Sequence, residues 1–176
     1  MTSRTERILI IDADEKARTD LARYLEARGF YVTGYPDLAG AKALFDDNIP
    51  DVIFADLSPE AIRDLASRLE EAETFTPIVA CSSSESSADV VNALRAGAAD
   101  FVLKPWQNEK LLATLSAAGR LRASRLEVSE LRTRQRDLTH ALDQSKDGLL
   151  GSAPAMRHVF DAIEKVAVTD ANVLIL

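Results

Sequence analysis

Residues 51–59, with the sequence DVIFADLSP, decide how the chain folds. Four apolar residues at 52–55 are followed by a single acid, Asp56, and then by Ser58-Pro59, a pair typical of a helix start. A short apolar run between turn residues is typical of a strand buried on both faces of a parallel sheet. Ligands of such sheets bind beyond the carboxyl ends of the strands. Asp56 is therefore the first candidate functional residue.

Two further polar segments also follow apolar runs. Asp12-Ala13-Asp14 comes after the run at 8–11, and Lys104-Pro105 comes after the run that ends at 103. Because the carboxyl ends of parallel strands lie at one edge of a sheet, we expect these side chains to meet Asp56. Carboxylate oxygens suit a divalent cation, and a lysine suits a phosphoryl group as a point charge. The sequence thus predicts a site for both.

The first 106 residues alternate between short apolar runs and amphipathic segments. The expected strands are 8–11, 30–33, 52–55, 77–81 and 100–103. The expected helices are 15–28, 38–47, 59–72, 86–96 and one that begins near 107, with Asp37 as a cap and Gly29 and Gly97 as helix ends. This alternation predicts an α/β fold with a five-stranded parallel sheet, right-handed crossovers and helices on both sheet faces.

Composition limits the cellular context. The chain has 176 residues, of which 47% are hydrophobic and 28% charged, an ordinary soluble composition. No apolar run approaches the roughly 18 residues of a membrane span, and the first residues lack the features of a signal peptide. The single cysteine, Cys81, excludes an internal disulfide and suits a reducing compartment. We therefore expect a cytoplasmic protein without a membrane segment.

The net charge of -7 is unevenly distributed. Residues 1–106 carry 11 basic and 19 acidic residues, whereas residues 107–148 carry 8 and 6. Because nucleic-acid phosphates bind basic surfaces, the first segment is a poor candidate for such binding. We interpret the arginines of the second segment as a solvated helix face, so direct nucleic-acid contact is not expected.

Residues 108–145 contain no proline and only one glycine, and they predict one long helix. Residues at two partner positions of a heptad, three residues apart, form an apolar stripe with polar interruptions. They are Leu121, Val128, Gln135, Leu142 and Leu149 at one position, and Ser124, Leu131, Leu138 and Ser145 at the other. This spacing is typical of a coiled coil. Because a lone helix needs a partner to bury such a stripe, we predict a parallel homodimer through residues 117–148.

The last 28 residues have a different character. They begin with LLGSAPAM at 149–156, continue as an amphipathic helix with Val159, Ile163 and Val166, and end in an apolar strand at 172–176. A helix and one strand cannot bury a core of their own. We therefore interpret residues 149–176 as the start of a further domain.

Several of these motifs together resemble a known family. Residues 7–116 resemble the receiver domain of two-component response regulators, through ILIIDAD at 8–14, Asp56, Ser82 and AGAADFVLKP at 96–105. Residues 149–176 are similar to the start of the AAA+ domain of NtrC-like activators of sigma-54 RNA polymerase. The resemblance implies three parts, namely a flavodoxin-like receiver domain at 1–116, a dimerisation linker at 117–148 and an AAA+ fragment at 149–176.

The resemblance also implies a role for each candidate residue. Asp56 would accept a phosphoryl group from a sensor histidine kinase, and Lys104 would pair with the phosphoryl oxygens. Ser82 would then donate a hydrogen bond to one of these oxygens, and Phe101 would turn inward in response. Contact with the sigma-54 holoenzyme of RNA polymerase would come only through a domain outside this chain.

Mg²⁺ is the cofactor that the resemblance implies. Its ligands would come from Asp12, Asp56 and the loop at Ser58, with Asp14 as a further candidate. Receiver domains usually carry two adjacent acids after the first strand, but here the second position is Ala13, which removes a direct ligand. The loop after Asp56 is also one residue shorter than usual, because its proline comes three residues on.

These two departures leave two interpretations open. In the first, the chain is a receiver module that is controlled by phosphorylation of Asp56. In the second, it is a pseudo-receiver that acts as a phosphorylation-independent dimerisation or docking module.

An enzyme is not expected. The phosphate-binding motif G-x-x-x-x-G-K-[ST] of ATPases is absent from the sequence. Neither His140 nor His158 lies near a predicted strand end, which makes a hydrolase a weak alternative.

Overall fold

Residues 6–41, 49–84, 86–144 and 153–167 are described by the computed structural model. The chain divides into two units, Met1–Glu130 and Leu131–Leu176, which we describe separately. The predicted domain boundaries after residues 116 and 148 are not tested by this division and stay predictions.

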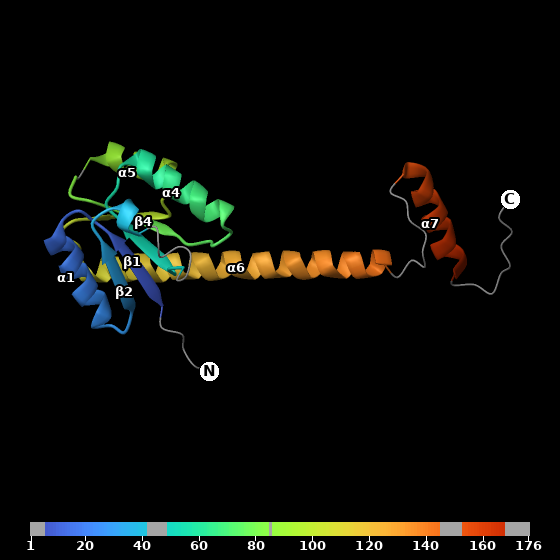
Figure 1. Ribbon diagram of the computed structural model, residues 1–176, viewed down its shortest axis with the longest axis horizontal. Coiled ribbons are helices and arrows are strands. Elements are labelled where there is room, and N and C mark those ends of the chain that lie inside the picture. Colours follow the sequence, from blue (N-terminus) through green and yellow to red (C-terminus); the bar gives the residue numbers. More distant parts are fainter. Residues whose placement is uncertain (1–5, 42–48, 85, 145–152, 168–176) are drawn as a thin grey trace. The chain divides into compact units, whose positions relative to one another are not determined.

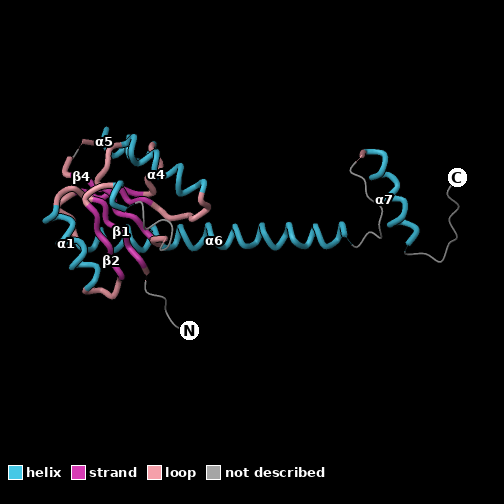
Figure 2. The backbone as a smooth tube through the Cα atoms, viewed as in Figure 1, coloured by secondary structure: helices cyan, strands magenta, loops and turns pink. Residues whose placement is uncertain are grey.

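The first unit contains five parallel strands in the order β2-β1-β3-β4-β5. Their bounds are β1 Arg7–Ile11, β2 Tyr31–Tyr35, β3 Val52–Ala55, β4 Ile78–Ser82 and β5 Asp100–Leu103. Figure 2 shows the strands side by side among the surrounding helices. The central strand β3 is buried at all four of its residues. The predicted α/β fold with a five-stranded parallel sheet is confirmed.

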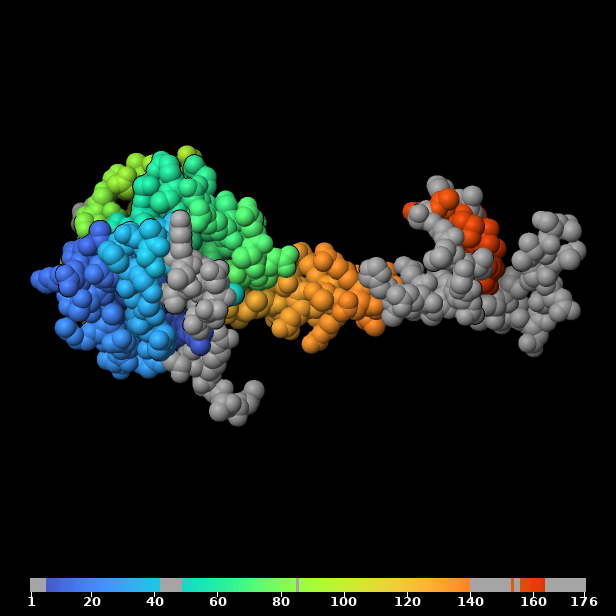
Figure 3. Space-filling model, in the orientation of Figure 1, coloured from blue at the N-terminus to red at the C-terminus, as the bar shows by residue number. Residues whose placement is uncertain are grey.

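Helices cover both faces of the sheet (Figure 1). Helix α1 (Glu15–Glu26) and the first turns of α6 (Asn108–Gln144) pack on one face, against Ile8, Ile10 and Phe54. Helices α4 (Pro59–Glu71) and α5 (Ser87–Arg95) pack on the other face, where the strands contribute residues such as Ile53 and Ala80. Figure 3 shows α1, the β2–α2 segment, α4 and α5 at the surface on one side of this unit.

Strand β2 is longer than predicted at its carboxyl end. The expected strand covered residues 30–33, but β2 continues through Gly34 to Tyr35 and pairs with β1 over its whole length. Gly34 fits because the stem of Arg18 covers it. A Cβ placed there would lie 3.1 Å from Arg18 Cγ and Cδ. The missing side chain is therefore replaced by one from α1.

Helix α2 (Leu38–Ala41) follows β2, and the predicted cap is confirmed because the Gly40 N–H donates to Asp37 Oδ1 at 2.8 Å. The expected helix extended to residue 47, and its residues 42–48 lie outside the described part of the chain. Gly29 and Gly97 end helices as predicted, with φ of 90° and 112°.

Gly97 is expected to be intolerant of a side chain. Its φ of +112° is disfavoured for other residues, and a Cβ would lie 2.9 Å from the Ala66 Cβ of α4. We predict that Gly97→Ala lowers the free energy of unfolding by about 2 kcal/mol, measured by urea denaturation.

Gly119 of α6 provides the matched control. A Cβ at this helical position would lie 3.6 Å from Glu6 Oε1, so Gly119→Ala has room and should raise stability by about 0.5–1 kcal/mol. Equal effects of the two substitutions would contradict this account of Gly97.

The second unit contains the end of α6 and helix α7 (Pro154–Ala167), so the long helix and the amphipathic helix predicted for these regions are confirmed. Val159 and Ile163 of α7 are exposed. The strand predicted at 172–176 lies outside the described residues. Among the helices of the described residues, none is long and apolar enough to cross a membrane.

Candidate functional site

Asp12, Asp56 and Lys104 meet beyond the carboxyl ends of β1, β3 and β5, at one edge of the sheet. Lys104 Nζ lies 2.5 Å from Asp12 Oδ2 and 2.5 Å from Asp56 Oδ2. The side chain of Asp12 is 4% exposed and that of Lys104 9%, whereas that of Asp56 is 38% exposed. Asp56 is therefore the group of the three that a partner from solution can reach.

The backbone fixes this arrangement. The Asp56 N–H donates to Ile11 O at 2.8 Å, which extends the β1–β3 pairing to the site. The Lys104 N–H donates to Ser82 O at 2.8 Å and extends the pairing of β4 with β5 in the same way. The three functional side chains therefore start from positions that the sheet itself sets.

Lys104 is charged in this environment. Burial acts first and lowers its pKa, but hydrogen bonds to Asp12 and Asp56 and the charges of both carboxylates outweigh it. The net result is a pKa above the usual 10.5. Lys104 thus acts as a fixed cation between two carboxylates.

The turn after β1 holds Asp12 in place. Asp12 Oδ1 accepts the Asp14 N–H at 2.9 Å, and the carbonyl of Asp12 accepts Arg18 Nη1 at 2.6 Å. Arg18 was not predicted from the sequence. Its position four residues after a helix cap gives only a weak signal for such a role.

Asp14, the further metal-ligand candidate, caps α1. Its carboxylate accepts the backbone N–H groups of Lys16 at 2.9 Å and Ala17 at 3.2 Å. The Ala17 bond contributes most to a pKa below the usual 3.8. This geometry directs Asp14 to the helix start, and Ala13 has no ligand atom in its side chain.

Ser58 is also engaged by a helix start. Its Oγ accepts the Ala61 N–H at 3.3 Å, and its carbonyl accepts the Ile62 N–H at 2.9 Å. Both oxygens of Ser58 therefore already serve α4. A role for Ser58 as a metal ligand stays a prediction.

Ser82 and Phe101 have different surroundings. Ser82 ends β4 at the same sheet edge, and its Oγ accepts the Ser84 N–H at 3.0 Å. Phe101 is 7% exposed and packs against Ile62 and Ala80. Phe101 thus already lies in the core, and its turning with Ser82 stays a prediction.

The sequence of residues 8–116 matches the family described as "Response regulator receiver domain". The chain belongs to this family. The receiver domain accordingly holds Asp12, Asp56 and Lys104, together with the whole five-stranded sheet.

Several known regulators are similar over nearly the whole chain. The alginate biosynthesis transcriptional regulatory protein AlgB of Pseudomonas putida is 34% identical over 174 residues, which cover 97% of this chain and 37% of AlgB. The regulatory protein AtoC of Escherichia coli is 30% identical, covering 96% of this chain and 36% of AtoC. A crystal structure of NtrX from Brucella abortus has a TM-score of 0.68 at 27% identity, covering 93% of this chain and 35% of NtrX.

The receiver domain offers two ligands that suit Mg²⁺. Asp12 and Asp56 converge on one cation, the Lys104 ammonium, and Mg²⁺ binds through one or two carboxylates together with phosphate oxygens and water. Among the described residues there is no group of three or more His, Cys, Asp or Glu that could hold a metal. The described residues therefore suit a metal ion that takes two carboxylate ligands from the protein and its remaining ligands from water or phosphate.

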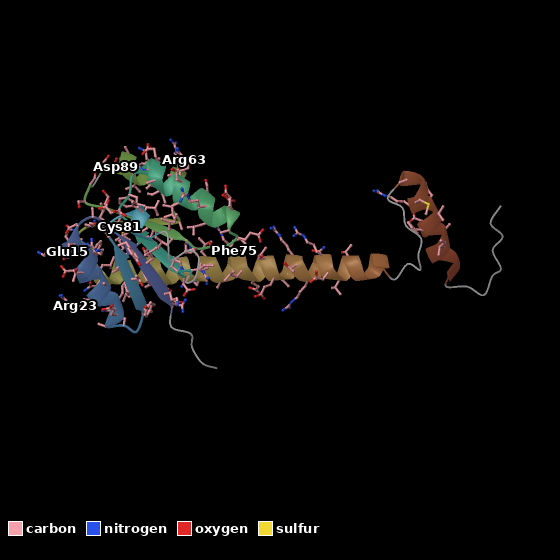
Figure 4. All side chains as sticks on the ribbon, viewed as in Figure 1. Glu15, Arg23, Arg63, Phe75, Cys81 and Asp89 are labelled. Carbon is pink, nitrogen blue, oxygen red and sulfur yellow. The ribbon has the colours of Figure 1, made fainter. Side chains whose placement is uncertain are left out.

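Cys81 lies beneath this site in β4. Figure 4 shows Cys81, Glu15 and Asp89 toward one end of the receiver domain, and Phe75, which precedes β4, toward the other. Burial is the main reason why the pKa of the Cys81 thiol is raised from 9.0 to about 12. Cys81 is a free, buried cysteine, and in this position it behaves as a small hydrophobic residue.

The Cys81 pKa gives the receiver domain an alkaline stability limit. Above pH 9.0 the unfolded thiol loses a proton that the folded thiol keeps until about 12, so the free energy of unfolding falls as the pH rises through this window. Lys104, whose pKa is raised, adds a second loss only above pH 10.5. We predict that urea midpoints of Cys81→Ala fall less between pH 8.5 and 10 than those of the unmodified chain. Parallel pH profiles of the two proteins would contradict this.

Proposed function

We propose that the chain is a phosphorylation-controlled receiver module in which Asp56 accepts a phosphoryl group from a sensor histidine kinase. The observation that carries the proposal is the contact of Lys104 with both Asp12 and Asp56, of which Asp56 is the more exposed carboxylate. A carboxylate that is reachable and faces a fixed cation suits transfer of an anionic group.

The transfer uses few groups of this chain. A carboxylate oxygen of Asp56 attacks phosphorus, the phosphorus–nitrogen bond of the phosphohistidine breaks, and the imidazole of the kinase leaves with the electron pair. Lys104 stays within reach of the site and neutralises charge on the transferred oxygens. Asp12 and Asp56 would hold Mg²⁺, which supplies further charge neutralisation when bound. Ser82 is the candidate donor to the modified Asp56.

The output proposed is transcriptional. The relative AlgB carries transcriptional regulation in its name, and this chain spans only about 37% of the length of AlgB and 36% of that of AtoC. Control of a sigma-54-type activator, through a domain outside this chain and without nucleic-acid contact from its own residues, is the proposed route. The cytoplasm is the proposed location.

The linker supports a homodimer as part of this function. The apolar residues of the predicted stripe that the structure describes on α6 are exposed: Leu121, Val128, Leu131 and Leu138. Every residue from 131 to 139 is exposed as well. A second copy of the same helix would bury this stripe.

Titration with beryllofluoride, a phosphoryl mimic, and Mg²⁺ tests the proposal by amide chemical shifts. We expect saturable shifts at Asp56, Ser82 and Phe101 that are absent from Asp56→Ala. Unchanged spectra at millimolar Mg²⁺ would overturn the phosphorylation mechanism. That result would favour the pseudo-receiver, for which Ala13 is the specific observation.

A further inference from the structure

Asp51 lies at the other end of the strand that carries Asp56. It directly precedes β3, at the amino-terminal edge of the sheet, whereas Asp56 directly follows this four-residue strand. Asp51 is a buried acid with 7% exposure. A buried carboxylate is costly unless it is paired, so its partners identify what the residue does.

The carboxylate of Asp51 joins two strands to a helix. Its Oδ2 accepts the Arg7 N–H of β1 at 2.8 Å, and the Asp51 N–H donates to Arg7 O at 2.7 Å. Its Oδ1 lies 2.8 Å from Nη1 of Arg122 in α6. The Arg122 side chain is 18% exposed and that of Asp51 10%, so water shields this ion pair less than an exposed one.

Arg122 continues the receiver-facing side of α6. The buried residues Leu111, Leu115 and Ala118 are spaced by four and three positions, and Arg122 follows four positions later on the same side. Past Arg122, only Leu126 and Ser129 are partly buried up to residue 139. Figure 1 shows the first part of α6 passing along the sheet.

The apolar stripe that is proposed to form the dimer, here called the dimer stripe, lies on a different side of α6. Leu121 and Ser124 belong to the stripe and are exposed, while Arg122 between them turns to Asp51. At 100° per residue, neighbouring positions of a helix point in different directions. The same turn of α6 can therefore hold the receiver domain and a second copy at once.

We propose that the Asp51–Arg122 ion pair anchors α6 to the amino-terminal edge of the sheet and so fixes the direction in which the dimer stripe leaves the receiver domain. Both are positioning residues for the linker. The anchor itself rests on the contacts above, and its part in signalling rests on the proposed function.

The anchor does not use every donor of the guanidinium. Arg122 Nη1 contacts Asp51, whereas the buried Nε has no hydrogen-bond partner among the described residues. When the charge of Arg122 is removed, the Asp51 carboxylate still accepts the Arg7 N–H of β1. We therefore expect local loosening of α6 around position 122 rather than loss of the sheet.

Amide hydrogen exchange of the full 176-residue chain tests the anchor. In Arg122→Met, amides of residues 119–126 should exchange at least about tenfold faster than in the unmodified chain, because opening of this turn no longer breaks an ion pair. Arg125→Met, an exposed arginine three residues on, is the matched control and should leave these rates unchanged. Equal rates in the two variants would overturn the anchor.

Asp51→Asn provides an independent arm. The amide oxygen of asparagine can still accept the Arg7 N–H, while its NH₂ group cannot pair with Arg122. We expect the same acceleration at residues 119–126, with no further increase in the double variant. Additive effects of the two substitutions would overturn the pairing.

The test separates this inference from the proposed function, because exchange is measured without Mg²⁺ or a phosphoryl donor. If Asp56 cannot be phosphorylated but residues 119–126 exchange faster in Arg122→Met, the anchor stands and the phosphorylation mechanism is rejected. If Asp56 takes up a phosphoryl group but the two arginine variants exchange at equal rates, the phosphorylation mechanism stands and the anchor is rejected.

Discussion

Replacing Lys104 by methionine is expected to lower the free energy of unfolding by about 3 kcal/mol in Mg²⁺-free buffer. Lys104 Nζ contacts both carboxylates of the site at 2.5 Å, and Asp12 is buried. Its removal leaves two carboxylates facing each other without their cation. This value lies at the lower end of the destabilisation that follows when one partner of a buried ion pair is removed, because the Asp56 side chain is 38% exposed to water.

Urea denaturation with and without Mg²⁺ measures this effect. Mg²⁺ should restore part of the stability of Lys104→Met, since the ion can take the place of the ammonium between Asp12 and Asp56. Lys110→Met, at an exposed position of α6, is the control and should change stability little. Similar unfolding midpoints for the two variants would contradict the role given to Lys104.

Replacing Ala13 by aspartate is expected to tighten Mg²⁺ binding by at least about tenfold, or about 1.4 kcal/mol. Ala13 follows Asp12 directly and is exposed in the turn before α1, so a carboxylate there can add an oxygen ligand. Other candidate oxygens already accept hydrogen bonds: Oδ1 of Asp14 accepts backbone N–H groups of α1, and both oxygens of Ser58 accept those of α4.

Titration calorimetry with Mg²⁺ measures this gain. Ala123→Asp, which adds the same charge at an exposed position of α6, is the control and should leave the dissociation constant unchanged. An equal constant for Ala13→Asp and the unmodified chain would show that the missing acid does not limit metal binding.

Local sequence patterns predict most of this fold. Runs such as VIFA at 52–55 predict buried strands because all of their residues are apolar, and β3 has these bounds. The carboxyl ends of the strands then bring Asp12, Asp56 and Lys104 together, as predicted. Both predictions depend on the spacing of apolar residues and on the order of strands and helices along the chain, which can be read directly from the sequence.

Contacts between distant residues could not be predicted in the same way. The second strand was expected to end at residue 33, but β2 continues through Gly34, which the stem of Arg18, sixteen residues earlier, covers. The direct contact of Lys104 with both carboxylates and the pairing of Asp51 with Arg122 also depend on tertiary geometry. The sequence predicts that Ser58 starts a helix. Only the structure shows that both Ser58 oxygens accept hydrogen bonds from α4, so that helix capping competes with metal binding.

The most direct test of the central claim is the intact mass of the chain after incubation with acetyl phosphate and Mg²⁺. The account predicts the added mass of one phosphoryl group on the unmodified chain and none on Asp56→Asn, in which the amide cannot act as the nucleophile. No added mass on the unmodified chain at millimolar Mg²⁺, or equal addition to both proteins, would contradict the assignment of Asp56 as phosphoacceptor.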